Sequence, residues 1–208
     1  MRLEDGRILA TPSGVPKGEL VPKQLVGLRG EGAPARARSR RRSTAPELNS
    51  HVSSEILMHM RIYALRPDVR AVCHAHPPTA TGFAAAGRAL DQALLGETAI
   101  LLGAVPLAPF GAPGTPELPD SITPYVPRAD AVLLANHGVV SYGEDLRTAL
   151  LRMELVEHAA RVTLLAELAG GARLLTRAQV EALVASRPRY GLAPLAPDAF
   201  GWRTAKDG

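Results

Sequence analysis

Val69-Arg70-Ala71-Val72-Cys73-His74-Ala75-His76-Pro77-Pro78 is the stretch of sequence on which the expected fold depends. Its apolar residues favour an extended strand, and alternate side chains of a strand point to the same face. His74 and His76 should therefore project together from one face. The two prolines that follow end the strand, because neither can donate a hydrogen bond to a neighbouring strand. The histidine pair is thus expected where a strand opens into a loop.

Two adjacent imidazoles are poor material for a protein core, because each carries ring nitrogens that need hydrogen-bond partners. They are well suited to bind a divalent metal such as zinc. The pattern His74-x-His76 alone also fits two surface or hydrogen-bonded histidines, so it leaves both interpretations open. A third histidine, His137, follows a buried strand expected over residues 130–135 and precedes Gly138. Three histidines at the ends of two strands favour a shared metal site.

A helix is expected over residues 53–66, before the histidine strand. Ser53 and Ser54 precede its apolar residues and are typical of a helix N-terminus, and Pro67 ends it. Glu55 falls in its first turn, where the helix dipole favours a carboxylate, so a structural role is sufficient to explain it. His59 lies one turn later on the same face and is given a structural role.

Residues 1–30 are expected to form two short strands around turns, one of them at Asp5-Gly6. The hydroxyl-rich segment Thr11-Pro12-Ser13-Gly14-Val15-Pro16 forms a tight turn. Such a turn can offer backbone N–H groups and hydroxyls to an anion, although most turns of this composition are only turns.

Further helices are expected after the histidine strand. A small helix over residues 79–86 ends at Gly87, and a long helix covers residues 144–169. The apolar stripe expected along the long helix is Leu146, Leu150, Met153, Val156, Ala160 and Leu164. A capping box of Thr176 and Gln179 begins a last helix that extends through Val184. Strands mixed with helices, with no internal repeat, predict a single α/β domain over residues 1–208. Residues 31–51 are expected to be a mobile Arg-rich connection and residues 188–208 a C-terminal tail.

The composition is that of a globular chain: of 208 residues, 46% are hydrophobic. One cysteine allows no intrachain disulfide, which favours a cytoplasmic location. The N-terminus has no signal-peptide pattern and no apolar run could cross a membrane. The net charge of +4 derives mainly from one basic cluster, Arg36, Arg38, Arg40, Arg41 and Arg42. A solvated loop is favoured over a nucleic-acid-binding patch, because no aromatic residue is interleaved to stack on bases.

Several of these motifs together resemble the class II aldolase/adducin family, and most of all its L-fuculose-1-phosphate aldolase-like members. The motifs are Ser53-Ser54-Glu55 with His59, Arg66-Pro67-Asp68, Ala71-Val72-Cys73-His74-Ala75-His76-Pro77-Pro78, Pro113-Gly114-Thr115-Pro116-Glu117-Leu118 and Ala135-Asn136-His137-Gly138. They occur in the family's order and spacing over roughly residues 5–165.

The resemblance implies α/β/α layers around a mainly antiparallel central sheet, assembled as a cyclic homotetramer with active sites at subunit interfaces. One Zn²⁺ per chain would be held by three histidines, and a carboxylate would be catalytic. Carried onto this sequence, the metal ligands are His74, His76 and His137, the catalytic carboxylate is Glu55, and the phosphate-binding residues are Ser13, Gly14, Ser53 and Ser54.

The implied reaction is cleavage of a ketose 1-phosphate, such as L-fuculose 1-phosphate, to dihydroxyacetone phosphate and an aldehyde. Three protein ligands leave an open position on a catalytic zinc, which would act as a Lewis acid on an enediolate. Glu55 would move the proton at the nucleophilic carbon. Related members of the family are epimerases and dehydratases of sugar phosphates, and adducin-like scaffolds form a non-catalytic alternative.

Two family features have no counterpart in the expected positions. The family's N-terminal helix and Gly-Asn-x-Ser phosphate loop would precede the Asp5-Gly6 turn. The tyrosine that a neighbouring subunit supplies as proton donor corresponds to Phe110, which cannot donate a proton. Tyr125 and Tyr190 are other candidates for that role.

Overall fold

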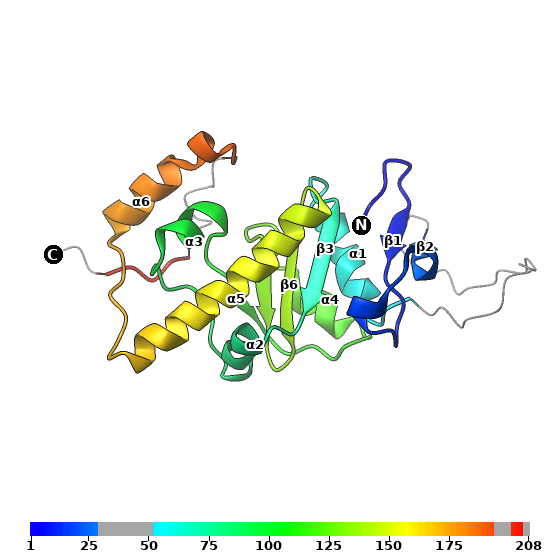
Figure 1. Ribbon diagram of the computed structural model, residues 1–208, viewed down its shortest axis with the longest axis horizontal. Coiled ribbons are helices and arrows are strands. Elements are labelled where there is room, and N and C mark those ends of the chain that lie inside the picture. The colour runs from blue at the N-terminus through cyan, green and yellow to red at the C-terminus, as the bar shows by residue number, and fades with distance from the viewer. Residues whose placement is uncertain (29–51, 194–200, 206–208) are drawn as a thin grey trace, which may run out of the picture.

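The computed structural model describes residues 1–28, 52–193 and 201–205 (Figure 1). The Arg-rich connection predicted over residues 31–51, with its arginine cluster, lies outside the described residues. Of the tail expected over residues 188–208, the structure describes residues 188–193 and 201–205. The first of these pieces includes most of a short helix, η3 (Arg187–Tyr190). In this extended piece Arg203 pairs with Gln92 and Ala205 pairs with Thr176.

A four-stranded sheet lies at the centre of the fold. Its strands are β3 (Ala71–Ala75), β4 (Leu107–Ala108), β5 (Ala131–Leu134) and β6 (Gly138–Gly143), in the order β3-β6-β5-β4. β3 with β6 and β5 with β6 are antiparallel, whereas β4 and β5 are parallel. The mainly antiparallel sheet expected from the family resemblance is therefore confirmed.

Helices cover both faces of the sheet because its side chains alternate between two apolar clusters. In β5, Val132 and Leu134 point into one cluster, and Ala131 and Leu133 point into the other. All four residues are buried, which is why this strand reads as a continuous apolar run. The three-layer α/β/α arrangement is thus present.

One face is covered by α1 (Ile56–Leu65) and α4 (Glu117–Ile122). Met58 and Ile62 of α1 are fully buried in the cluster on this face, together with Ile122 of α4. α1 has Arg66 as its C-cap, directly before Pro67, as the sequence predicted.

The other face is covered by α2 (Pro78–Ala85) and the long helix α5 (Leu146–Leu168), as Figure 1 shows. The helix limits agree with the prediction within two residues, but the predicted apolar stripe is only partly correct. Met153, Val156 and Ala160 are buried as expected. Its other members, Leu146, Leu150 and Leu164, are 52%, 50% and 42% exposed, and the small residues Ala149 and Thr163 face the sheet instead.

The remaining elements flank this core. Near the N-terminus they are β1 (Ile8–Ala10) and β2 (Val26–Leu28), an antiparallel pair, with η1 (Lys17–Glu19) and η2 (Pro22–Gln24) between them. The others are α3 (Gly96–Leu101) and α6 (Arg177–Ala185), which pack together, and α6 carries the predicted capping box of Thr176 and Gln179.

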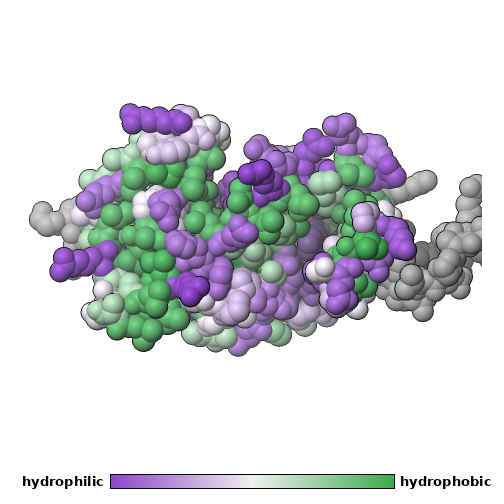
Figure 2. Space-filling model, viewed as in Figure 1, coloured by the Kyte–Doolittle hydropathy of each residue, from purple (hydrophilic) through white to green (hydrophobic). Residues whose placement is uncertain are grey.

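Apolar residues also gather on the surface. Figure 2 shows them over the C-terminal half of α5 and the elements beside it. The exposed ones include Leu101, Leu164, Leu165 and Leu168. Within the described residues, no helix combines the length and the apolar composition needed to cross a bilayer.

Candidate metal centre

The three predicted metal ligands lie together at one end of the central sheet. β3 pairs with β6 so that His74 is opposite Val140 and Ala75 is opposite Val139. His76 follows the end of β3, and His137 lies in the turn that connects β5 to β6. The ring centroids form a nearly equilateral triangle with sides of 4.8, 4.9 and 4.9 Å. One nitrogen from each ring falls within 4.8 Å of the others.

A hydrogen bond determines which ring nitrogen of His74 is free to bind a metal. Nδ1 of His74 lies 2.9 Å from the carbonyl oxygen of Val139, and since a carbonyl only accepts, Nδ1 must carry the proton. The lone pair of His74 is therefore on Nε2, 3.1 Å from Nε2 of His76. A metal ligand fixed by a hydrogen bond from its other ring nitrogen is a common arrangement.

The geometry of the three rings fits a zinc ion. With Zn–N bonds of about 2.1 Å, tetrahedral coordination separates ligand nitrogens by roughly 3.4 Å, close to the 3.1 Å between Nε2 of His74 and Nε2 of His76. Nδ1 of His137 is buried and finds no hydrogen-bond partner among the described residues. Three histidines that each offer a nitrogen would leave a fourth position for water or substrate, which is the pattern expected of a catalytic zinc site.

The surroundings favour the neutral form of His74 and His137. Burial is the main reason that the pKa of His74 falls to about 4; the hydrogen bond to Val139 opposes this, while the neighbouring His137 and His76 lower it further. Burial also lowers the pKa of His137, against the opposing charge of Glu55. Neutral imidazole is the form that binds a metal, so the site is ready for one at neutral pH.

The turn before β6 brings backbone very close to His76. Asn136 has φ = 55°, the left-handed conformation that asparagine tolerates better than most residues. Gly138 follows His137, and a β-carbon at this position would lie 2.4 Å from Cδ2 of His76 and 2.7 Å from the oxygen of Ala75. Glycine at this position therefore allows the backbone to approach the imidazole of His76 closely.

Glu55 lies beside the histidines, but not in the first turn of α1 as predicted. It is the N-cap residue, and its backbone N–H donates to Oγ of Ser53 at 3.3 Å. Oε1 of Glu55 is 3.5 Å from Oγ of Ser54, and Oε2 is buried without a hydrogen-bond partner among the described residues. The charge of this carboxylate raises the pKa of His137, as expected for two side chains that lie near each other. A buried oxygen with no partner is available to a ligand or a proton.

His59 is closer to this site than its predicted structural role suggested. It lies one turn along α1 from Glu55 and is half-buried. Burial lowers its pKa to about 3, and the charge of His74 is the next cause. The sequence did show that Glu55 and His59 are four positions apart and so share one helix face. That spacing alone could not show that this face lies near the histidine strand.

The structure brings together the two segments predicted to bind phosphate. The N–H of Ser53 donates to the oxygen of Thr11 at 3.2 Å, and Pro12 pairs with Val52. The turn that contains Ser13 and Gly14 therefore lies beside Ser53 and Ser54. Ser13, Gly14 and Ser54 are exposed, and Gly14 has φ = 74°. Their binding of a phosphate stays a prediction.

Two further residues, Lys17 and Glu157, contact the backbone beside predicted site residues and were not predicted. Nζ of Lys17 donates to the oxygen of Pro12 at 3.1 Å, which places a cation beside the Ser13-Gly14 turn. Glu157, 81 positions after His76 in the sequence, contacts the backbone that follows the histidine pair. The side chain of Phe110, at the position that corresponds to the family's tyrosine, is 59% exposed.

Comparisons with known proteins identify the family. The profile of the Class II Aldolase and Adducin N-terminal domain matches residues 1–164. A 3-oxo-tetronate 4-phosphate decarboxylase of Pectobacterium atrosepticum is 32% identical over 166 residues, which are 77% of this chain and 70% of that protein. The L-fuculose phosphate aldolase of Escherichia coli is 29% identical over 164 residues, or 79% and 70%.

Solved structures agree in fold. An L-fuculose 1-phosphate aldolase superposes with a TM-score of 0.72 at 27% identity, covering 89% of this chain and 81% of the other. The L-fuculose-1-phosphate aldolase of Thermus thermophilus gives 0.65 at 27% identity, covering 80% of each chain. With a profile match over most of its length, this chain belongs to the class II aldolase and adducin family, and it resembles the family's metal-dependent lyases.

Proposed function

We propose that the protein is a zinc-dependent lyase that cleaves a carbon–carbon bond of a phosphorylated sugar. The favoured reaction is that of an aldolase, in which a ketose 1-phosphate such as L-fuculose 1-phosphate gives dihydroxyacetone phosphate and an aldehyde. The observation that carries the proposal is the convergence of three histidines with one oxygen of Glu55 that is buried and has no partner among the described residues. A scaffold protein has no use for this combination.

Each residue of the site has a defined part in the proposed reaction. His74, His76 and His137 hold the ion, which supplies Lewis acidity to the substrate oxygen that becomes negative as the bond breaks. When that bond breaks, its electron pair stays on the carbon beside the carbonyl. Glu55 then delivers a proton to this carbon, and takes it back in the direction of synthesis.

The phosphate of the substrate is assigned to the two adjoining turns at Ser13-Gly14 and Ser53-Ser54. Their support is proximity: the N–H of Ser53 bonds to the oxygen of Thr11, and three of the four residues are exposed. Lys17 adds a positive charge at the first turn. Turns rich in N–H groups and hydroxyls, with a cation beside them, suit a phosphate group.

Decarboxylation is a second candidate, and Phe110 is the observation that favours it. Aldol cleavage must remove a proton from the hydroxyl of the departing aldehyde, and phenylalanine cannot accept or donate one. In the decarboxylation of a 3-oxo acid the departing group is carbon dioxide, so no hydroxyl proton has to be moved. The electron pair again stays beside the carbonyl, and Glu55 keeps the same task.

Metal content tests the proposal first. We expect about one zinc per chain in protein purified without added metal, and loss of that zinc in His74→Ala. Glu55→Gln should keep the metal and lose most of the turnover, since an amide cannot deliver the proton. Absence of metal from the wild type, with no uptake from zinc solution, would contradict the proposal. Loss of zinc from a folded Glu55→Gln variant would make Glu55 chiefly a ligand.

Product analysis separates the two reactions. A ketose 1-phosphate should release an aldehyde and dihydroxyacetone phosphate if the enzyme is an aldolase. A 3-oxo-tetronate 4-phosphate should release carbon dioxide if it is a decarboxylase. Introducing Phe110→Tyr should increase aldehyde release if a missing proton donor limits aldol cleavage.

The proposed assembly is a cyclic homotetramer with active sites at subunit interfaces, acting in the cytoplasm. Its support is the exposed apolar surface, in particular Phe110 at 59% exposure and Leu168 at 76%. The single cysteine agrees with a reducing compartment.

A further inference from the structure

The helix that follows the histidine pair begins with a shortage of hydrogen-bond acceptors. Pro77 is the N-cap of α2 and provides no side-chain cap, while Pro78, the first helical residue, has no N–H. The N–H of Thr81 bonds to the oxygen of Pro77 at 2.9 Å. The N–H groups of Thr79 and Ala80 remain without an acceptor in their own helix, as is normal for a helix N-terminus.

Glu157 satisfies both of these groups at once. Its Oε1 accepts from the N–H of Thr79 at 3.0 Å, and its Oε2 accepts from the N–H of Ala80 at 2.8 Å. Both oxygens of one carboxylate are therefore used on a helix N-terminus, where the helix dipole also favours negative charge.

Glu157 is itself held firmly. It lies in the middle of α5, between Val156 and Ala160, which are both fully buried against the sheet. Ala80 and Phe83 of α2 pack in the same apolar cluster. The carboxylate thus connects a well-packed helix to the start of α2, which is two residues after His76.

His76 has few other restraints. It follows the last residue of β3, so it lies outside the strand pairing that fixes His74, and the next two residues are prolines. Its ring rests against the backbone at Gly138. The path of residues 76–80 is consequently set on one side by β3 and on the other by the hydrogen bonds to Glu157.

We infer that Glu157 is a positioning residue for the metal site, which places His76 by anchoring the N-terminus of α2. This inference rests on the proposed metal centre. It predicts that removal of the carboxylate lowers metal affinity, because the loop that carries one of three ligands loses its anchor. A cap with a merely structural role would lower stability and leave metal affinity unchanged.

The test measures affinity for Co²⁺ and Zn²⁺ by chelator competition, together with the visible spectrum of the Co²⁺ form. Glu157→Ala should weaken binding by about tenfold, the lower limit for groups that support metal ligands from outside the coordination shell. Glu157→Gln, which keeps one accepting oxygen, should show a smaller loss. If Glu157→Ala does not fold, Glu157→Gln is the variant on which metal affinity is measured.

Two controls on the same helix separate position from stability. Asp145→Ala removes the N-cap of α5, where Oδ1 accepts from the N–H of Thr148 at 2.6 Å, at the end of β6 away from the histidines. It should lower the melting temperature without changing metal affinity. Glu154→Gln, an exposed carboxylate one turn before Glu157, should change neither.

The outcomes distinguish this inference from the proposed function. Wild-type protein that takes up no metal would overturn both. Wild-type protein that binds metal, with Glu157→Ala and Glu157→Gln binding it equally tightly, would overturn the inference alone. Equal loss of affinity in Asp145→Ala and Glu157→Ala would also overturn it, since affinity would then follow general stability.

Discussion

At the scale of single residues, the proposed metal centre depends on the absence of a β-carbon at Gly138. Gly138 lies where any β-carbon would overlap the ring of His76 and the oxygen of Ala75. Its role is steric, because its backbone does not have a positive φ. The glycine allows the strand that follows His137 to pass directly under a second ligand, and this close approach keeps the three imidazoles within coordination distance.

Gly138→Ala should therefore displace His76. We expect zinc affinity to fall by about tenfold or more and the free energy of unfolding to fall by about 1–3 kcal/mol from overpacking. The matched control is Gly82→Ala in α2, where an added β-carbon meets nothing within 4 Å. It should keep the affinity and leave stability equal or slightly higher, because alanine favours helix. Unchanged affinity in Gly138→Ala would mean that His76 is not a ligand.

The acid sensitivity of the metal-free protein should also originate in single residues. His74 and His59 have pKa values of about 4 and about 3 in the folded state, below the ordinary value of 6.5. As pH falls below 6.5 the unfolded chain binds protons that the folded chain does not. Each histidine therefore lowers the free energy of unfolding by roughly 1.4 kcal/mol per pH unit until its folded pKa is reached.

Urea unfolding of the apoprotein at pH 7, 6 and 5 measures this dependence. His59→Gln removes one of the histidines with a lowered pKa and should make the slope shallower. The lowered carboxylate pKa values, such as those of Asp68 and Asp145, act only below about pH 4 and do not interfere. Stability independent of pH between 7 and 5 would contradict the burial of these imidazoles.

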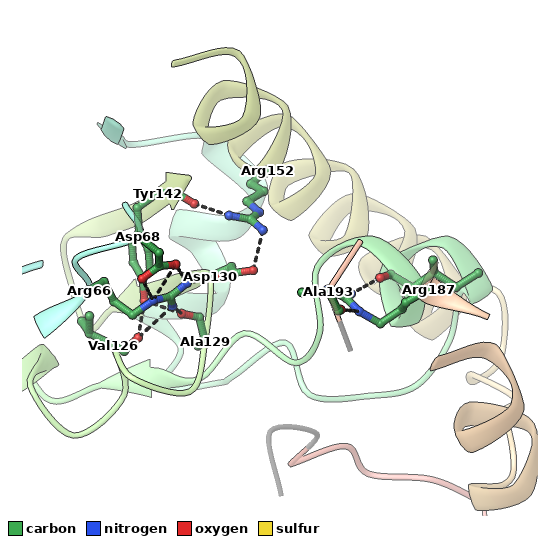
Figure 3. A network of polar contacts seen from close by, with 10 residues as sticks. Arg66, Asp68, Val126, Ala129, Asp130, Tyr142, Arg152, Arg187 and Ala193 are labelled. Atoms are coloured by element: carbon green, nitrogen blue, oxygen red, sulfur yellow. Dashed lines mark hydrogen bonds and ion pairs between the residues drawn. The ribbon is translucent and has the colours of Figure 1, made fainter. Parts of the chain in front are cut away.

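At the scale of elements, a partly buried ionic network joins α1, β5 and α5 at the end of the sheet away from the three histidines (Figure 3). Asp130, directly before β5, bonds to Arg66 at 3.1 Å and to Arg152 at 2.6 Å. The three side chains are only 13–20% exposed. Arg66 is the C-cap of α1 and Arg152 lies on α5, so one carboxylate connects the two helical layers across the sheet.

Asp130→Ala should be destabilising by about 3 kcal/mol, the lower end for a broken buried ion pair, because it removes the carboxylate that two partly buried guanidinium groups share. The control is Asp120→Ala, which breaks the exposed pair with Arg61 and should cost no more than about 1 kcal/mol. Thermal and urea unfolding measure both. A small effect at Asp130 would show that water or the neighbouring Asp68 compensates for the loss.

The elements could largely be predicted from sequence, because their signals are local. Prolines and capping residues set the limits of α1, α2 and α6, and alternation placed His74 and His76 on one face. The exposed leucines of α5 could not be predicted, since a helix rich in leucine does not reveal which of them face the sheet. Glu157 was missed because its partners are 77 and 78 positions earlier in the chain.

In the candidate site, too, features with local sequence signals could be predicted and contacts between distant segments could not. The three histidines could be found because each follows or ends a strand, and the family resemblance supplied the connection between them. The contact of the two phosphate-site turns depends on pairing between Thr11 and Ser53, across the undescribed residues 29–51. No local pattern encodes a pairing of that kind.

At the scale of the whole molecule, the proposed tetramer makes a prediction about mass. Static light scattering at micromolar concentration should give four times the mass of one chain. Leu165→Lys with Leu168→Lys, at positions 55% and 76% exposed, should lower that mass if this surface is buried between subunits. Leu146→Lys, at the other end of α5, tests whether any exposed leucine has the same effect. A monomer mass for the wild type would contradict the proposed assembly.

The pairing of β3 with β6 has a consequence for how the protein folds. The hydrogen bond from His74 to Val139 joins residues that are 65 positions apart in the sequence, and His137 lies two positions before Val139. Bringing such distant segments together is slow compared with forming a helix or a hairpin. A metal that requires both segments cannot bind until they have met. The visible absorbance of bound Co²⁺ should therefore appear late during refolding, and its rate should report when β3 and β6 pair.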